Sequence, residues 1–173
     1  MGWLWLNATA NLLGAGPEEA GPLFFSFVHD GDVVPMLAAL ELFRDERDLP
    51  VARVWEGRRW RTSAVVPMGG RVLFERLACG SSSSSSASAS SSSTTPIRGE
   101  EEGEGEGEER RFVRVIVNDG VVALSGCRDG PGESCPLERF LAFVKRRGEE
   151  VGDFREVCGL GPDAADRITF LHQ

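Results

Sequence analysis

An imidazole and a carboxyl group are adjacent in this sequence, at His29 and Asp30. Histidine can bind an anion or transfer a proton near neutral pH, and a neighbouring carboxyl group can act as a general acid. Only one further histidine is present, His172 beside the C-terminal residue. A His-Asp pair taken alone is more often a polar loop pair than a site, so the surrounding elements decide its meaning.

The residues around His29 and Asp30 predict a buried strand followed by a helix. Residues 23–28 read L-F-F-S-F-V, and such an apolar run is typical of a strand buried on both faces. Residues 33–43 are nearly all apolar and predict a helix, with Pro35 in its first turn, where a missing N–H matters little. We therefore expect the pair at the carboxyl end of a strand, facing a helix N-terminus that favours an anion such as phosphate.

The rest of the chain predicts a mixed α/β fold. Amphipathic helices are expected at residues 3–13 and 136–148, and strands at residues 63–79, 112–117 and 121–124. Asn118-Asp119-Gly120 is a tight-turn signal between the last two strands, so the three strands should form an antiparallel patch. In the first of them, Arg71, Glu75 and Arg76 are expected to alternate with apolar residues.

Three stretches of the sequence resemble the histidine acid phosphatases, especially the fungal acid phosphatase and phytase B-type branch. Residues 26–40 (S-F-V-H-D-G-D-V-V-P-M-L-A-A-L) resemble the second active-site motif of that family. Residues 65–79 (V-V-P-M-G-G-R-V-L-F-E-R-L-A-C) and 127–137 (C-R-D-G-P-G-E-S-C-P-L) follow in the family's order. The resemblance implies the C-terminal part of an α/β fold of the histidine phosphatase, phosphoglycerate mutase-like type.

The family resembled here hydrolyses phosphate monoesters through a phosphohistidine intermediate, without a metal or other cofactor. Carried over by position in the motif, His29 would bind the substrate phosphate, and Asp30 would be the general acid that protonates the leaving alcohol. Asp32 adds a negative charge near this site, so phytate would suit it less well than a simple monoester. No His/Cys cluster has metal-ligand spacing, so no metal is expected.

The nucleophilic histidine of that family belongs to an R-H-G-x-R-x-P motif whose arginines bind the phosphate, and these 173 residues do not contain the motif. Neither His29 nor His172 is preceded by Arg or followed by Gly. We therefore expect a C-terminal fragment of an acid phosphatase that is inactive alone. The alternative is a catalytically dead fragment or pseudoenzyme that acts only as an interaction module.

Composition predicts one domain, formed by residues 1–79 and 111–173 and divided by an insertion. Residues 80–110 contain a serine run and a Glu-Gly run, which cannot bury enough apolar surface to fold, so we expect disorder there. This insertion is either neutral or a regulatory acidic arm. The net charge of −8 argues against a nucleic-acid partner, although Trp55 and Trp60 lie among four arginines.

No apolar run approaches the roughly 20 residues that a bilayer requires. No basic leader precedes the first apolar residues, so neither a membrane span nor a signal peptide is expected. The resemblance nevertheless implies a secreted or vacuolar protein. Asn7 opens an N-A-T sequon on the polar face of the first predicted helix, and glycosylation there would require the secretory pathway.

Four cysteines allow three fully paired connectivities. The resemblance implies a bridge between Cys127 and Cys135. It also implies that Cys79 and Cys158 pair with upstream cysteines that this sequence lacks. The alternative is four reduced thiols in a cytosolic protein.

Overall fold

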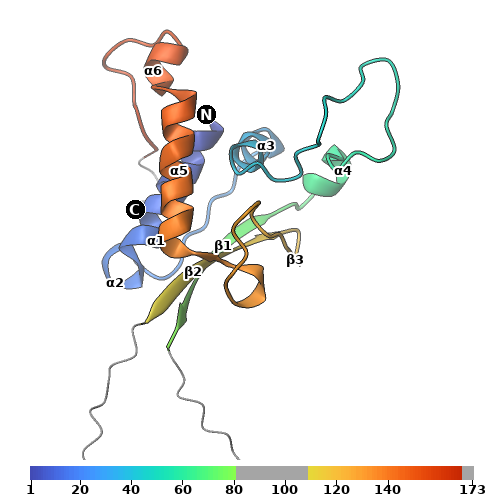
Figure 1. The fold of residues 1–173 in the computed structure, drawn as a ribbon. Coiled ribbons are helices and arrows are strands. Elements are labelled where there is room, and N and C mark those ends of the chain that lie inside the picture. The colour runs from blue at the N-terminus through green and yellow to red at the C-terminus, as the bar shows by residue number, and fades with distance from the viewer. Residues whose placement is uncertain (81–108, 169–173) are drawn as a thin grey trace, which may run out of the picture.

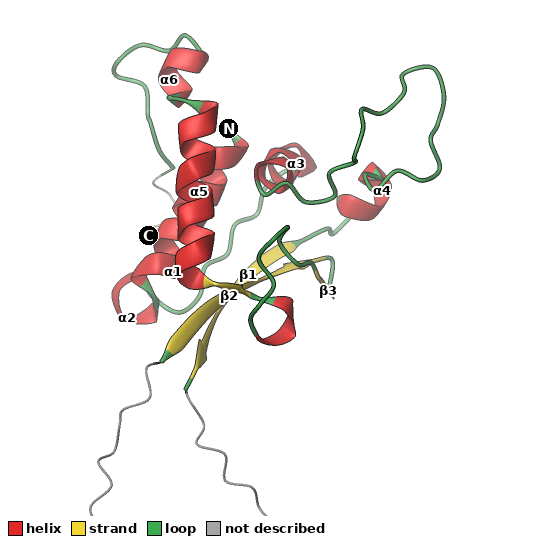
Figure 2. Ribbon diagram, in the orientation of Figure 1, coloured by secondary structure: helices red, strands yellow, loops and turns green. Residues whose placement is uncertain are grey.

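Helices gather on one side of a small antiparallel sheet in the computed structural model of this protein (Figure 1). The structure describes residues 1–80 and 109–168, so most of the insertion predicted at 80–110 lies outside the described residues. Figure 2 shows the helices and strands, which are α1 (Gly2–Ala15), α2 (Pro17–Ala20), α3 (Asp30–Ala39), α4 (Thr62–Val65), β1 (Val72–Cys79), β2 (Arg110–Val117), β3 (Gly120–Val121), a 3-10 helix (Pro131–Glu133), β4 (Cys135–Pro136), α5 (Leu137–Val151) and α6 (Phe154–Val157).

β2 is the central strand of the sheet. It pairs with β1 along its whole length, while β3 pairs with its end and β4 with its beginning. The turn between β2 and β3 uses Asn118 and Asp119, whose φ angles are 50° and 69°. Asn and Asp tolerate this left-handed backbone better than other non-glycine residues, which confirms the predicted turn. The predicted antiparallel patch is confirmed as well.

The prediction of one long strand over residues 63–79 is wrong at its beginning, where α4 forms instead. Pro67 and Gly70 then close a turn, because the Gly70 N–H donates to the Pro67 carbonyl (2.8 Å). The Asn118 side-chain amide donates to the carbonyls of Ala64 and Val65 (both 2.9 Å), and its oxygen accepts from the N–H of Arg71 (3.0 Å). These bonds fix the chain ahead of β1, so strand pairing starts only at Val72.

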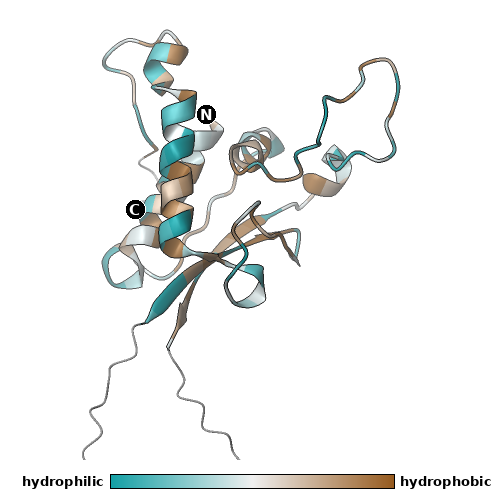
Figure 3. Ribbon diagram, in the orientation of Figure 1, coloured by the Kyte–Doolittle hydropathy of each residue, from teal (hydrophilic) through white to brown (hydrophobic). Residues whose placement is uncertain are grey.

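One face of the sheet is part of the hydrophobic core. The register places Phe74 of β1 opposite Val115 of β2, and the Phe74 ring lies 6.3 Å from that of the fully buried Phe140 on α5. α5 confirms the predicted amphipathic helix, and Figure 3 shows its alternating hydrophilic and hydrophobic turns. On the other face, Arg114 pairs with Glu75 at 2.6 Å.

Arg76 lies on the core face, and its predicted position on the polar face with Glu75 is wrong. The register sets it opposite Val113, which is buried. Its guanidinium group lies against Gly16, between α1 and α2, where a β-carbon on residue 16 would overlap it. The alternation of side chains along β1 therefore places Arg76 on the core face despite its charge. Its long aliphatic stem reaches the edge of the core.

α1 packs between α3 and α5, and this position explains why its burial does not follow a single stripe. Gly2 lies against the backbone of Pro35 in α3 so closely that a β-carbon would overlap the Pro35 carbonyl. On the other side, the Trp3 indole N–H donates to the Val144 carbonyl of α5 (2.9 Å), and its ring contacts Gly148. The predicted helix is confirmed, but Asn7 is half-buried instead of lying on an exposed polar face.

Residues 23–28 do not form the predicted buried strand in the described chain. They are a connector without regular secondary structure between α2 and α3, and all six residues are exposed. The apolar pattern is that of a strand, but the described residues supply no strand beside it. The apolar pattern of a segment predicts that the segment is buried, but it does not identify the polypeptide that buries it.

We expect Gly2→Ala to destabilise the protein, because a side chain would push α1 away from α3. Overpacking of this kind costs about 1–3 kcal/mol in free energy of unfolding. Gly14→Ala is the matched control in the same helix, since its β-carbon would meet Leu141 methyl groups at ordinary contact distances (3.6 and 3.7 Å). That variant should be unchanged or up to about 1 kcal/mol more stable. Urea unfolding of both variants measures the difference, and equal stability would contradict the tight α1–α3 contact.

Candidate functional site

His29 and Asp30 lie together at the N-terminus of α3, as the sequence predicts. His29 is the N-cap residue with an extended backbone (φ −78°, ψ 158°), and Asp30 is the first helical residue. The helix begins three residues earlier than predicted and ends at Ala39. Consequently Pro35 lies in the second turn, and its predicted place in the first turn is wrong.

Asp32 accounts for the earlier start of α3. Its carboxylate accepts a hydrogen bond from the backbone N–H of His29 (3.2 Å), which is the reciprocal half of a capping box. Asp30 and Asp32 also place two negative charges in the first turn, where the helix dipole favours them. The three-residue spacing between His29 and Asp32 was the sequence signal for this cap.

The far end of α3 is anchored in the core, which fixes the direction of the helix. Leu37 and Leu40 are almost completely buried. The N–H of Leu42 donates to the Leu37 carbonyl (3.1 Å), with Glu41 in a left-handed conformation, as in a Schellman termination. Arg147 of α5 donates to the Ala39 carbonyl (3.3 Å). The buried C-terminal end therefore holds the exposed N-terminal end in place.

The residues His29 and Asp30 are both exposed. Asp30 makes one local hydrogen bond, from the Gly31 N–H to its carboxylate (2.9 Å). No Arg or Lys of the described chain forms an ion pair with Asp30 or Asp32. An imidazole, a carboxyl group and a helix N-terminus can bind an oxyanion and donate a proton, but nothing in this arrangement supplies the arginine clamp of a phosphate site.

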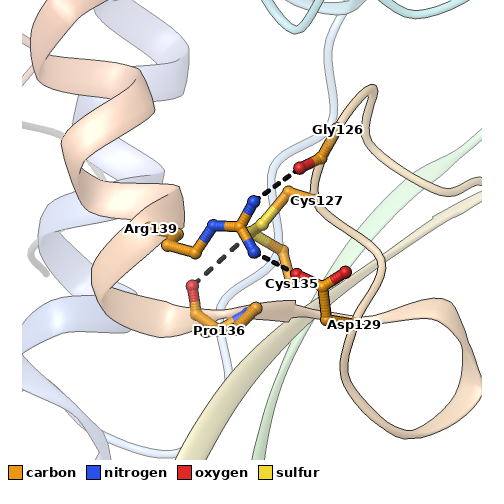
Figure 4. Close-up of a disulfide and its surroundings, with 6 residues drawn as sticks. All are labelled: Gly126, Cys127, Asp129, Cys135, Pro136 and Arg139. Atoms are coloured by element: carbon orange, nitrogen blue, oxygen red, sulfur yellow. Dashed lines mark hydrogen bonds and ion pairs between the residues drawn. A yellow bond between two sulfur atoms is a disulfide. The ribbon is translucent and has the colours of Figure 1, made fainter.

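The predicted disulfide between Cys127 and Cys135 is present (Figure 4). Cys135 is buried on β4, directly before α5. Arg139, in the first turns of α5, donates to the Gly126 carbonyl (2.6 Å) and forms an ion pair with Asp129. The bridge and this arginine together close the loop against the start of α5, and no sequence pattern indicated the role of Arg139.

The other predicted features are dispersed. Cys79 ends β1 and Cys158 follows α6, and both are free thiols, so their pairing with cysteines elsewhere stays a prediction. Among the described residues, no three His, Cys, Asp or Glu side chains are grouped closely enough to hold a metal ion. None of the described helices combines the length and the apolar character needed to cross a membrane.

Comparison with known proteins gives consistent matches. The model of the histidine phosphatase superfamily (branch 2) matches residues 1–118. Acid phosphatase PHO1 of Komagataella pastoris is 35% identical over 168 residues, which are 95% of this chain and 30% of that protein. Phytase PHO112 of Candida albicans is 31% identical over 170 residues, 98% of this chain and 30% of that protein.

A solved structure matches as well. The phytase from D. castellii superposes with a TM-score of 0.74 at 25% identity and covers 98% of this chain. The match covers 30% of that phytase chain. This chain therefore spans about 30% of the length of each relative named here.

Removing the disulfide by a Cys127→Ser, Cys135→Ser double substitution should lower the free energy of unfolding by about 2.5 kcal/mol on the chain-entropy model. Cys158→Ser is the control, because that thiol is exposed and unpaired, and it should leave stability unchanged. Urea unfolding under oxidising conditions measures both variants. A quantitative Cys127–Cys158 link in non-reducing peptide maps would contradict the assigned bridge.

Proposed function

This chain belongs to branch 2 of the histidine phosphatase superfamily, and we propose that it supplies the leaving-group side of an acid phosphatase active site. Asp30 acts as the general acid that protonates the leaving alcohol of a phosphate monoester, and His29 binds the phosphate. The observation that carries the proposal is the position of both side chains, adjacent and exposed at the N-terminus of an anchored helix.

The chemistry of this position suits the proposed roles. The positive end of a helix dipole favours an oxyanion, so a phosphate beside His29 would be held close to Asp30. A positioned carboxylic acid that protonates a leaving oxygen typically contributes a factor of about 10²–10⁴ to the rate. Asp32 is engaged in the helix cap but keeps its charge close by, which favours simple monoesters over the densely charged phytate.

These residues do not form a complete site, because the 173 residues contain no R-H-G-x-R-x-P sequence. The proposed nucleophile and arginine clamp must come from the polypeptide that corresponds to the other 70% of a relative. We propose that the 173-residue chain alone is therefore inactive. The same polypeptide would supply cysteines for Cys79 and Cys158.

We propose that the protein acts in an oxidising compartment, as a secreted or vacuolar phosphatase. The Cys127–Cys135 bridge supports this, because such bridges persist outside the reducing cytosol. Asn7 would be the glycosylation site. Because its side chain is half-buried within α1, attachment of the glycan would have to precede the packing of that helix.

The purified 173-residue chain should not hydrolyse p-nitrophenyl phosphate at any pH between acid and neutral. Joining it, as one continuous chain, to the part of PHO1 that it does not match should give an active chimera. In that chimera, Asp30→Asn should reduce kcat on an alkyl phosphate by about 10²–10⁴. Asp163→Asn, another exposed aspartate, is the control and should leave kcat unchanged.

Two results would contradict this assignment. Metal-independent turnover by the 173-residue chain, abolished by His29→Ala, would make His29 itself the nucleophile. An active chimera in which Asp30→Asn and Asp163→Asn have the same kcat would show that the general acid does not lie on α3.

A further inference from the structure

An aspartate followed by a glycine is prone to spontaneous rearrangement of the backbone, and this sequence contains three such steps. They are Asp30-Gly31, Asp119-Gly120 and Asp129-Gly130. In this reaction the glycine nitrogen attacks the side-chain carboxyl carbon of the aspartate. Glycine favours the attack because it has no β-carbon to hinder it and its backbone rotates freely. The three steps differ in how their surroundings hold them.

Two of the three aspartates are held by an arginine. The Nε of Arg71 donates to one carboxylate oxygen of Asp119 (3.0 Å), and a terminal nitrogen of the same guanidinium group pairs with the other oxygen. Asp129 forms an ion pair with Arg139 (Figure 4). A carboxylate held by a guanidinium group keeps its charge and its orientation, which opposes both the loss of an oxygen as water and rotation toward the backbone.

The glycines of these two steps are held as well. Gly120 pairs with Val117 in the hairpin of β2 and β3. The N–H of Gly130 donates to the Ser134 carbonyl (2.8 Å), and a β-carbon on Gly130 would overlap the Phe112 ring. Movement of either glycine nitrogen onto the preceding carboxyl carbon would break these contacts.

The Asp30-Gly31 step has neither kind of restraint. No Arg or Lys of the described chain forms an ion pair with Asp30. Its carboxylate instead accepts a hydrogen bond from the Gly31 N–H (2.9 Å), whose nitrogen is the attacking atom. Both residues are exposed, and a β-carbon on Gly31 would meet no atom within 4 Å. The reacting groups are therefore already in contact at a helix end, where the backbone opens most readily.

We propose that Asp30-Gly31 is a site of spontaneous isoaspartate formation, which inactivates the proposed general acid. The Gly31 nitrogen forms a bond to the carboxyl carbon of Asp30. One carboxyl oxygen leaves as water, which carries away the amide proton and the proton of the carboxyl group. Water then adds to either carbonyl of the resulting succinimide ring and reopens it, giving aspartate or isoaspartate. No oxidant, reductant or other co-reactant is consumed.

Neither product keeps the carboxyl group of residue 30 in its original place. The succinimide has no carboxyl group there. Isoaspartate carries its free carboxyl group on the α-carbon, one methylene nearer the backbone, and its main chain is one methylene longer. A general acid must lie within hydrogen-bond reach of the oxygen that it protonates. This loss of catalysis rests on the proposed function, whereas the rearrangement itself follows from the surroundings of the Asp30-Gly31 step.

Incubation of the 173-residue chain in mildly acidic buffer tests the proposal without reference to catalysis. Peptide mapping with electron-transfer fragmentation detects the succinimide, which is lighter by one water, and distinguishes isoaspartate from aspartate. Both products should accumulate severalfold faster at Asp30 than at Asp119 or Asp129.

Substitutions at the glycine and at an arginine make the test specific. Gly31→Ala should slow the rearrangement at Asp30 about tenfold, because the methyl group restricts the backbone and hinders the attack. Since that methyl group meets no atom, the fold should be unchanged. Arg71→Gln should raise the rate at Asp119 severalfold, because it releases that carboxylate. Arg53→Gln is the matched control and should change none of the three rates, because Arg53 lies on a separate loop without an Asp-Gly step.

The continuous chimera with the unmatched part of PHO1 separates this inference from the proposed function. During storage, the loss of kcat on an alkyl phosphate should follow the modified fraction at Asp30, and Gly31→Ala should slow both. Modification of Asp30 without loss of kcat would support this modification site while contradicting the role of Asp30 as the general acid.

Two outcomes would overturn the proposal. The first is an equal rate of rearrangement at all three Asp-Gly steps of the folded chain, since the arginine contacts would then protect nothing. The second is a folded chain in which Asp30 stays unmodified while a synthetic peptide of residues 26–34 rearranges in the same buffer, since the helix would then prevent the reaction.

Discussion

The packing of α1 between α3 and α5 is the contact on which the rest of this structure depends. Gly2 lets the α1 backbone touch that of Pro35, and the Trp3 indole donates to α5 across the opposite side. α5 in turn covers the sheet through Phe140, and its Arg147 binds the C-terminal end of α3. The direction of α3, and with it the position of His29 and Asp30, therefore follows from a contact made more than twenty residues earlier in the chain.

Local signals predicted the elements that are stabilised locally. The amphipathic spacing of α5 predicted that helix, and Asn118-Asp119-Gly120 predicted a turn whose left-handed backbone those residues tolerate. The bridge between Cys127 and Cys135 followed from family resemblance, not from geometry. The start of α3 was missed because the helical pattern was taken from apolar residues alone, whereas Asp32 extends the helix by capping it.

Features that depend on distant partners could not be predicted. Arg76 reads as a surface residue, yet strand register sends it to the core face beside Gly16. Residues 23–28 have the pattern of a buried strand, yet they are exposed in the described chain. In both cases the surrounding polypeptide, which a local sequence pattern does not describe, decides the environment of the residues. For the candidate site, the sequence predicted which two side chains meet at a helix N-terminus, but not the exposure of the apolar residues that precede them.

The central claim is that Asp30 protonates the leaving group, and the dependence of rate on leaving-group quality tests it most directly. In the active chimera, Asp30→Asn should slow the hydrolysis of an alkyl phosphate by a factor of about 10²–10⁴, because an unprotonated alkoxide is a poor leaving group. The same variant should slow the hydrolysis of p-nitrophenyl phosphate far less, because p-nitrophenolate is a good leaving group without a proton. An equal loss on both substrates would contradict the account and would make Asp30 a residue that only positions the substrate.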